Sequence, residues 1–335
     1  MSPLFPGIFF REGRFMSILV TGAYGFIASR LAHALLQKGQ KDLLLVDKAD
    51  YLLTRSCAQG LESLPFLDRE KLLGDLSNLS QVTAVIHLGA CTDTGNHDQA
   101  YMWKMNTDYT KTLWQWCAKK KIPLIYASSG ATYGRGEEGY SDDHRDIPKY
   151  KPLNVYGRSK HEFDLWALEQ KAAPPRWYGL KFFNVYGMDE NHKGRMASPI
   201  FHGFYEIKKT EKQTLFKSHK EGVADGEQKR DFIFVDDIVK LCLFCLEKNP
   251  PSGIYNCGTG QARTFLDVSK ALFKALGIPQ KIEWVDTPEK FRAGYQYFTQ
   301  ADMGKMRGAG YSESFLPVEQ GVAIYVKWLL GQTRA

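Results

Sequence analysis

The chain has 335 residues, of which 44% are hydrophobic and 24% are charged, a composition typical of a globular protein with a sizeable core. It carries 44 Lys and Arg against 37 Asp and Glu, and this small positive excess suits a protein that binds anionic small molecules better than one that binds nucleic acid. No apolar run approaches the roughly 20 residues of a membrane helix, so no membrane partner is expected.

Six cysteines in this length do not make a disulfide scaffold. Cys242 and Cys245 form a C-x-x-C inside Asp237–Lys248, which is predicted to be a helix, and the second pair needed for the commonest Cys-only zinc site is missing. We therefore expect no metal site and a reducing, cytoplasmic location.

Residues 1–16 are predicted to be an N-terminal extension, because they lack the features of a secretory signal and Met16 directly precedes the first apolar strand. Short apolar strands then alternate with helical patterns. The predicted strands are Ser17–Val20, Leu43–Val46, Ala84–Leu88, Pro123–Ala127, Tyr178–Phe183 and Arg230–Val235. The predicted helices include Phe26–Lys38, Asp236–Leu246, Phe265–Leu276 and Val318–Leu329.

This alternation predicts an α/β fold, a Rossmann-type doubly wound parallel sheet that is buried on both faces. The dinucleotide-binding domain would comprise residues 17–186 and 230–262. Residues 187–229 are rich in Gly, Lys, His and Glu and have weak periodicity. We predict that they build, with residues 263–335, a smaller α/β lobe that binds the substrate.

A glycine-rich turn joins the first strand to the first helix. Gly22 allows a tight turn, Gly25 lets the backbone approach a pyrophosphate, and the following helix presents free N–H groups to phosphates. Asp47, at the end of the second strand, has the spacing of an acceptor for a ribose hydroxyl. These features predict a dinucleotide site. Asp47 favours an unphosphorylated ribose, whereas Lys48 or Arg55 could neutralise a 2′-phosphate, so the residues leave NAD and NADP both open.

Tyr156 and Lys160 lie four positions apart, so on a helix they share one face. A tyrosine with a pKa near 10 is a poor base at neutral pH, and a nearby ammonium group would lower that pKa by favouring the phenolate. Ser129 ends a predicted strand, where its hydroxyl would face the ligand crevice of an open α/β sheet.

The glycine turn, Ser129 and the Tyr156–Lys160 pair resemble the extended short-chain dehydrogenase/reductase superfamily, over nearly the whole chain after Ser17. The resemblance implies hydride transfer, with Ser129, Tyr156 and Lys160 as catalytic residues. It implies NADP as the cofactor, with NAD as the alternative, and a homo-oligomer. The cofactor-binding residues are then expected to be Gly22, Gly25, Phe26, Ile27, Asp47, Lys48, Arg55, Leu88, Gly89, Ala90, Cys91, Asn106, Lys160, Val185 and Lys193.

Dehydratases of the superfamily carry an Asp-Glu pair where this chain has Ala131 and Thr132, so an epimerase or a net reductase is expected. A finer resemblance points to the family of ADP-L-glycero-D-manno-heptose 6-epimerases. It rests mainly on HKGRMAS (His192–Ser198) and YQYFTQAD (Tyr295–Asp302), which are more specific than the widely shared FFNVYG and RDF segments.

That resemblance implies inversion at C6″ of the heptose through a transient ketone, for the inner core of lipopolysaccharide. A proton must leave and return on opposite faces, and the resemblance assigns the second acid–base group to Lys193. Arg230 also suits a diphosphate by its own chemistry. Arg195 stands where the family usually has serine. The implied substrate contacts are Ser129, Asn184, Arg195, His202, Phe216, Arg230 and Tyr295.

Two alternatives remain at this point. A UDP-hexose 4-epimerase, or another nucleotide-sugar epimerase or reductase of the superfamily, would share Ser129, Tyr156 and Lys160 without needing HKGRMAS. A cofactor-binding sensor would keep the fold, although such proteins commonly lose the tyrosine or the lysine.

Overall fold

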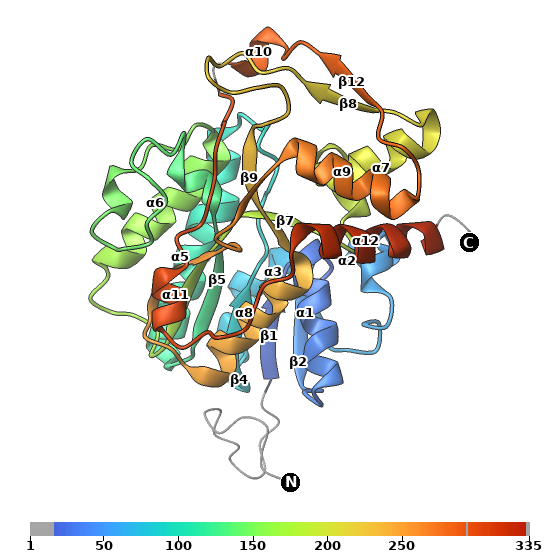
Figure 1. The fold of residues 1–335 in the computed structure, drawn as a ribbon. Coiled ribbons are helices and arrows are strands. Elements are labelled where there is room, and N and C mark those ends of the chain that lie inside the picture. Colours follow the sequence, from blue (N-terminus) through green and yellow to red (C-terminus); the bar gives the residue numbers. More distant parts are fainter. Residues whose placement is uncertain (1–16, 293, 333–335) are drawn as a thin grey trace.

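The computed structural model describes residues 17–292 and 294–332, so the predicted N-terminal extension lies outside the described residues. The main feature of the fold is a sheet of seven parallel strands in the order β10-β6-β5-β4-β1-β2-β3 (Figure 1). The strands are β1 (Ser17–Thr21), β2 (Leu43–Asp47), β3 (Phe66–Asp68), β4 (Val82–His87), β5 (Leu124–Ser129), β6 (Trp177–Phe182) and β10 (Gly253–Cys257). The strand order reverses beside β1, as in a Rossmann-type doubly wound sheet, and this confirms the predicted fold class.

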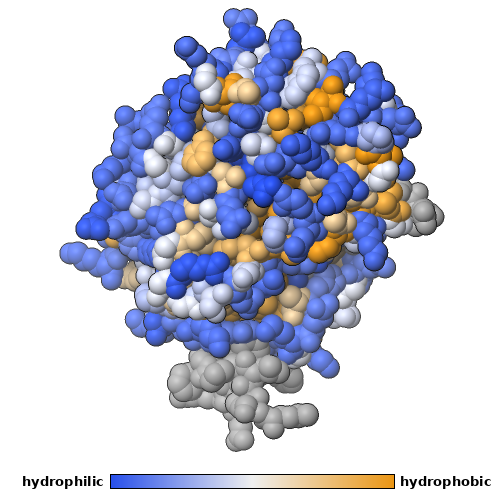
Figure 2. Space-filling view, in the orientation of Figure 1, coloured by the Kyte–Doolittle hydropathy of each residue, from blue (hydrophilic) through white to orange (hydrophobic). Residues whose placement is uncertain are grey.

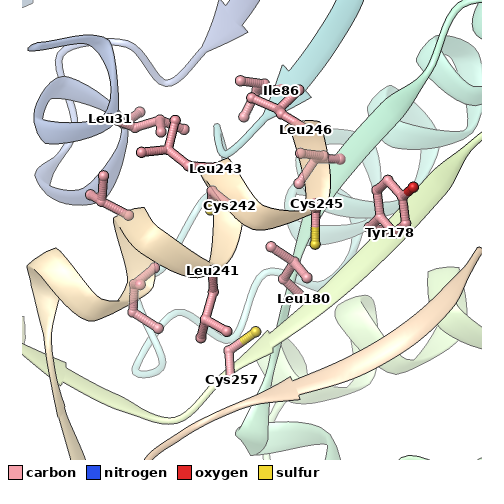
Figure 3. Packing of buried hydrophobic residues seen from close by; sticks show 14 of the residues in the cluster. Leu31, Ile86, Tyr178, Leu180, Leu241, Cys242, Leu243, Cys245, Leu246 and Cys257 are labelled. Carbon is pink, nitrogen blue, oxygen red and sulfur yellow. The ribbon is translucent and has the colours of Figure 1, made fainter. Parts of the chain in front are cut away.

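Helices cover both faces of this sheet, because neighbouring residues within each strand are both apolar. They are α1 (Phe26–Gln37) and α8 (Val235–Lys248) on one face, and α3 (Arg69–Asp75), α5 (Tyr109–Lys120) and α6 (Val155–Glu169) on the other. In β1, Ile18 and Val20 belong to the first layer and Leu19 to the second. Figure 3 shows the first layer, where Leu31 of α1 and Leu243 of α8 pack together.

One predicted strand does not belong to this sheet. The segment predicted as Arg230–Val235 forms β9 (Lys229–Phe234), but β9 pairs with β7 (Asn184–Tyr186) and β11 (Ala262–Thr264) in a separate three-stranded sheet. The large sheet is completed instead by β10 and β3, which the apolar pattern missed. β3 has only three residues, all half-buried, and therefore gives little periodic signal.

The smaller lobe is built on this second sheet, together with the parallel pair β8 (Gln213–Phe216) and β12 (Ile282–Val285). The helices α7 (Pro199–Thr210), α9 (Phe265–Leu276) and α12 (Val318–Gln332) pack on it around Phe204, Phe232 and Leu272. The weak periodicity missed α7. Its start is nevertheless visible in the sequence as Ser198-Pro199, where the Ser198 hydroxyl accepts a hydrogen bond from the third helical amide.

Part of the segment assigned to the lobe packs elsewhere. Met303, Met306 and Tyr311 lie in the core of the larger body, and α11 (Gly304–Gly308) sits beside β10. The chain thus returns to the large sheet before α12 joins the lobe. Three further short helices are α2 (Ala49–Thr54), α4 (Gln99–Met102) and α10 (Glu289–Arg292).

Cys242 and Cys245 are buried in α8, and all six cysteines are free thiols, in agreement with the expectation of no disulfide scaffold. None of the helices in the described part of the chain has the length and apolar character needed to cross a membrane. On the face shown in Figure 2, hydrophilic residues dominate and are interrupted by apolar patches over the region of α9 and α12.

Candidate active site

The glycine turn between β1 and α1 is built for close backbone contact. Gly22 has a φ of +66°, and a Cβ there would lie 2.7 Å from the Cα of Gly89, in the loop after β4. The amide of Gly25 donates to the carbonyl of Gly22 (2.7 Å) and closes the turn. Gly25 precedes α1 and has no side chain to cap it, so the first amides of the helix are available to an anion. This geometry fits a pyrophosphate group.

Asp47 lies at the end of β2 beside this turn. Its carboxylate accepts hydrogen bonds from the amides of Tyr24 (2.9 Å) and Lys48 (2.9 Å), and burial raises its pKa. Arg55 donates to the carbonyl of Tyr24 (3.1 Å) and stacks on the ring of Tyr51, with the side chain of Lys48 over the same ring. Two cations and one carboxylate therefore surround the position expected for the ribose.

The expected catalytic residues meet at the ends of β5 and α6. Ser129 is the last residue of β5, and a side-chain hydrogen bond joins it to Tyr156 in the first turn of α6. Asn154 caps α6 by accepting from the amide of Gly157 (2.7 Å). Lys160 follows one turn later and donates to the carbonyl of Ala127 (2.9 Å). The structure thus brings the three residues together as the sequence predicted.

The expected lowering of the tyrosine pKa by the lysine is not found. Burial raises the pKa of Tyr156, and the hydrogen bond from Ser129 opposes this rise only in part. Burial also lowers the pKa of Lys160 from its usual 10.5 to about 8, despite the nearby carboxylate of Asp164. The physical reason is desolvation, which disfavours the charged form of each group.

Asn106 supports the loop that follows β4 and lies in the π-helical turn Trp103–Asp108, between α4 and α5. Its side chain accepts from the amide of Cys91 (2.8 Å) and donates to the carbonyl of the same residue (3.0 Å) and to the hydroxyl of Ser159 (3.0 Å). These bonds hold Leu88–Cys91, which is half-buried at the cleft, against the catalytic helix. Asn106 is itself buried, so it acts on this wall of the cleft through the backbone.

A buried ion pair that the sequence did not reveal lies behind the catalytic residues. Lys181 of β6 and Asp164 of α6 are 2.7 Å apart, and both side chains are fully buried. Asp164 also accepts from Ser128 (2.6 Å), and Lys181 donates to Thr132 (2.7 Å). Thr132, at a position where dehydratases carry an acid, is thus tied into the support of β5. The only sequence signal was the placement of Asp164 one turn after Lys160.

Lys193 lies in the segment 191–196, which we call the lysine segment. Its ammonium group is 3.5 Å from the buried carboxylate of Glu190 and 4.8 Å from the centre of the Phe26 ring. Glu190 is anchored in turn by the amide and hydroxyl of Ser198, both at 2.6 Å. Lys193 is therefore held at the start of α1, beside the glycine turn.

A cavity of about 170 Å³ lies in the lobe between α7, β8 and α9. Three of the expected substrate contacts line it, namely His202, Phe216 and Tyr295. His202 is exposed at this cavity and is not a packed core residue. Gln213 and Gln228 also line the cavity, and the side-chain oxygen of each is buried with no hydrogen-bond partner among the described residues. The sequence analysis missed both glutamines, because nothing in their local pattern distinguishes them from surface residues.

Arg230 lies beside this cavity, with its guanidinium carbon 5.7 Å from the ring centre of Phe265 and 5.8 Å from that of Tyr295. It is 9% exposed, and no carboxylate among the described residues forms an ion pair with it. The neighbouring Asp231 instead accepts hydrogen bonds from Thr259 and other loop residues. Burial lowers the pKa of Arg230. A buried cation without a counter-ion is a ready site for an anion.

Two expected substrate contacts behave differently. Arg195 does not line the cavity; it is largely exposed and pairs with Asp93, at 2.5 and 2.7 Å from its two carboxylate oxygens. Asn184, half-buried at the start of β7, accepts from the hydroxyl of Thr299 (3.4 Å). Val185 follows it in β7, also half-buried. The expectation that Arg195 contacts the substrate therefore has no support in this geometry.

No three His, Cys, Asp or Glu side chains gather as a metal site in residues 17–292 and 294–332. The arrangement is that of an alcohol-oxidising site: a dinucleotide cleft, a phenol with a serine and a lysine, and an adjoining cavity with a buried cation.

Comparisons with known proteins agree with this geometry. Residues 18–258 match the model of the NAD dependent epimerase/dehydratase family. The chain is 44% identical to an ADP-L-glycero-D-manno-heptose-6-epimerase of Fusobacterium nucleatum, over 92% of this chain and 97% of that protein. It is 40% identical to an enzyme of the same name from Brachyspira hyodysenteriae, over 93% and 97%.

A solved structure of the Helicobacter pylori ADP-L-glycero-D-manno-heptose-6-epimerase superimposes with a TM-score of 0.77 at 25% identity, covering 94% of this chain and 96% of that chain. Family model, relatives and structure therefore agree over almost the full length of the chain. The protein is an isomerase that belongs to the NAD dependent epimerase/dehydratase family, in the group of ADP-L-glycero-D-manno-heptose-6-epimerases.

Proposed function

We propose that this protein interconverts ADP-D-glycero-D-manno-heptose and ADP-L-glycero-D-manno-heptose by transient oxidation at C6″. The reaction type is supported by Ser129, Tyr156 and Lys160, which converge at the cleft beside the glycine turn. The observation that carries the choice of sugar is the identity of 44% and 40%, over more than nine-tenths of the chain, to two epimerases that act in this way by name.

The cofactor that we infer is NADP. A bound nicotinamide dinucleotide supplies the acceptor and the donor of the hydride. The glycine turn fits its pyrophosphate, and Asp47 has unused lone pairs for a ribose hydroxyl. Lys48 and Arg55 stand around Tyr51 without a carboxylate partner among the described residues, which suits a 2′-phosphate. NAD would offer these two cations no phosphate at this position.

In the oxidative half-reaction, Tyr156 takes the proton of the C6″ hydroxyl. Ser129 orients that hydroxyl and the phenol, since its own hydroxyl already bonds to Tyr156. Because burial raises the pKa of Tyr156, the phenolate needs positive charge nearby. We assign this positive charge to the Lys160 ammonium group, which lies one turn along α6.

The ketone formed at C6″ then turns over in the site and is reduced on its other face. A proton must be delivered from that side, and we assign this role to Lys193. Its ammonium group is held beside the glycine turn by Glu190. Gly194 follows it with a φ of +52° and no atom within 4 Å of the position of a Cβ, so the backbone there has room to move the lysine.

The rest of the substrate would extend into the lobe. The Arg230 guanidinium suits the diphosphate, and the aromatic walls of the adjoining cavity suit a planar base. The unpaired oxygens of Gln213 and Gln228 are acceptors. They favour a base with an amino group, which adenine carries and uracil lacks.

We also propose a role in heptose supply to the lipopolysaccharide inner core, as the family resemblance in the sequence implies. We infer a cytoplasmic location, because nucleotide sugars are made there and the six cysteines are free. We infer a homo-oligomer from the family. Gel filtration with light scattering would test the last point.

The substrate is tested by incubating the protein with NADP and either ADP-D-glycero-D-manno-heptose or UDP-galactose and following C6″ and C4 by NMR. Inversion at C6″ of the heptose is expected, with no change at hexose C4. Inversion only at hexose C4 would overturn the assignment. The variant Tyr156→Phe should bind cofactor normally. Its rate should fall by more than about a hundredfold, which is the usual contribution of a general base to the rate.

A further inference from the structure

The lysine segment spans the cofactor cleft from the ribose end to the end beyond Cys91. The amide of Asn191 bonds to Ser56 (3.4 Å), and His192 contacts the thiol of Cys57 (3.8 Å). Lys193 lies over Phe26. At the far end, Arg195 and Met196 contact the loop after β4. The five residues of the nucleotide-binding body that receive these contacts are Ser56, Cys57, Phe26, Asp93 and Thr94.

The contact of Arg195 with the loop after β4 is shaped for a guanidinium group. One of its nitrogens lies 2.5 and 2.7 Å from the two oxygens of Asp93. The amide of Gly95 donates to Asp93 (2.9 Å) and fixes the carboxylate. A Cβ on Gly95 would lie 2.8 Å from a guanidinium nitrogen of Arg195, so the glycine leaves room for it. The charge and orientation of Asp93 and the space above Gly95 therefore all suit the guanidinium group of Arg195.

Lys193 lies between two anchors of the lysine segment. On one side is the buried Glu190, which bonds to Ser198 and contacts Lys193. On the other side is the Arg195–Asp93 pair. Glu190 holds the segment to the lobe, whereas the second anchor is, within the described part of the chain, the ion pair that joins it to the nucleotide-binding body. Loss of this second anchor would leave Lys193 held through Glu190 on one side, with the weaker Thr94–Met196 contact remaining on the other.

We propose that Asp93 and Arg195 form a latch that holds the lysine segment over the cofactor cleft, so that Arg195 is a positioning residue for Lys193 and retains the cofactor. The assignment of Lys193 as an acid–base group rests on the proposed function, but the retention of cofactor does not. A cofactor that is reoxidised in each turnover has to stay bound while the ketone exists, and a latch serves this need.

The size of the effect follows from the exposure of the pair. An exposed ion pair contributes little, and with two short contacts to one carboxylate we expect up to about a fivefold change. The variants Arg195→Ala and Asp93→Asn should each release cofactor up to about fivefold faster. The double variant D93N/R195A should release cofactor no faster than either single variant, because both changes remove the same ion pair.

The experiment measures release directly. Full-length protein is loaded with NADPH, mixed with excess NADP, and the decay of protein-bound NADPH fluorescence is followed without any sugar. Arg145→Ala is the matched control, because Arg145 is an exposed arginine that pairs at 2.5 Å with Asp143, two positions away in its own loop. It should leave release unchanged. Release by the single latch variants that equals wild type, or a double variant whose acceleration is the product of the accelerations in the two singles, would overturn the latch.

Kinetics with the nucleotide sugar then separate positioning from substrate contact. A latch predicts a lower kcat in both single variants with nearly unchanged KM. If Arg195→Ala raises KM while Asp93→Asn does not, Arg195 is a substrate ligand and the proposal is wrong. If the heptose is not epimerised at all, the proposed function fails, while the release rates still decide whether the latch exists.

Discussion

The buried charge of Lys160 should lower the free energy of unfolding, and a substitution that removes this charge should raise it. The side chain is 4% exposed, its ammonium group donates only to the carbonyl of Ala127, and burial lowers its pKa from 10.5 to about 8. That difference corresponds to about 3 kcal/mol at neutral pH, because one pKa unit is worth about 1.4 kcal/mol. Replacing the lysine with methionine also loses one hydrogen bond, worth about 1 kcal/mol. We therefore expect Lys160→Met to be more stable by about 2 kcal/mol at pH 7.

The pH dependence of this gain has a definite sign. Below pH 8 the lysine is charged in both states, so the wild type bears the full cost of burying it. Between pH 8 and 10.5 only the unfolded lysine holds its proton, so the cost shrinks as the pH rises, and above 10.5 it is gone. The advantage of the variant over the wild type should therefore be largest near neutral pH and should fade across this window.

Urea denaturation of both proteins at several pH values from 7 to 10.5, without cofactor, measures the difference. Lys181→Met is the matched control, because Lys181 is equally buried but paired with Asp164. It should destabilise the protein by about 3–5 kcal/mol, since it leaves a buried carboxylate without its counter-ion. A Lys160→Met protein that is less stable than wild type at pH 7, or whose advantage persists at the highest pH, would refute the reasoning.

Three further outcomes are expected. Arg55→Ala should weaken NADPH binding by roughly tenfold to a hundredfold, the value of a charge-assisted contact, with little effect on NADH; equal losses in fluorescence titrations would contradict a 2′-phosphate site. Gln228→Leu should weaken ADP binding by roughly tenfold in calorimetry and spare UDP. Gly22→Ala should abolish cofactor binding and lower the Tm, because a Cβ would collide with Gly89; normal binding would exclude the close approach.

The fold class was predictable because it depends on repeated local signals. Apolar strands that alternate with helices allow few arrangements other than a covered parallel sheet. Membership of a particular sheet was not predictable in the same way. The strand at residues 229–234 looks like any buried strand, yet its pairing with β7 and β11 was decided by the tertiary fold.

The placement of the proposed catalytic residues was predictable for a related reason. Ser129 follows directly from the end of a strand, and Tyr156 and Lys160 are fixed relative to each other by one turn of a helix. Such short-range geometry is written in the spacing of the residues. Their protonation was not predictable, because the pKa of Tyr156 depends on how much solvent its surroundings exclude.

By itself, the sequence determined the glycine turn, the meeting of Ser129 with Tyr156 and Lys160, and the family, since each rests on signals within short segments of the chain. Only the tertiary structure decided which charges meet. It pairs Arg195 with Asp93, 102 positions away, and Asp164 with Lys181 on another element, and it leaves Arg230 buried without a carboxylate. The physical reason is that the partner and the hydration of a side chain depend on packing between distant segments, which local spacing does not record.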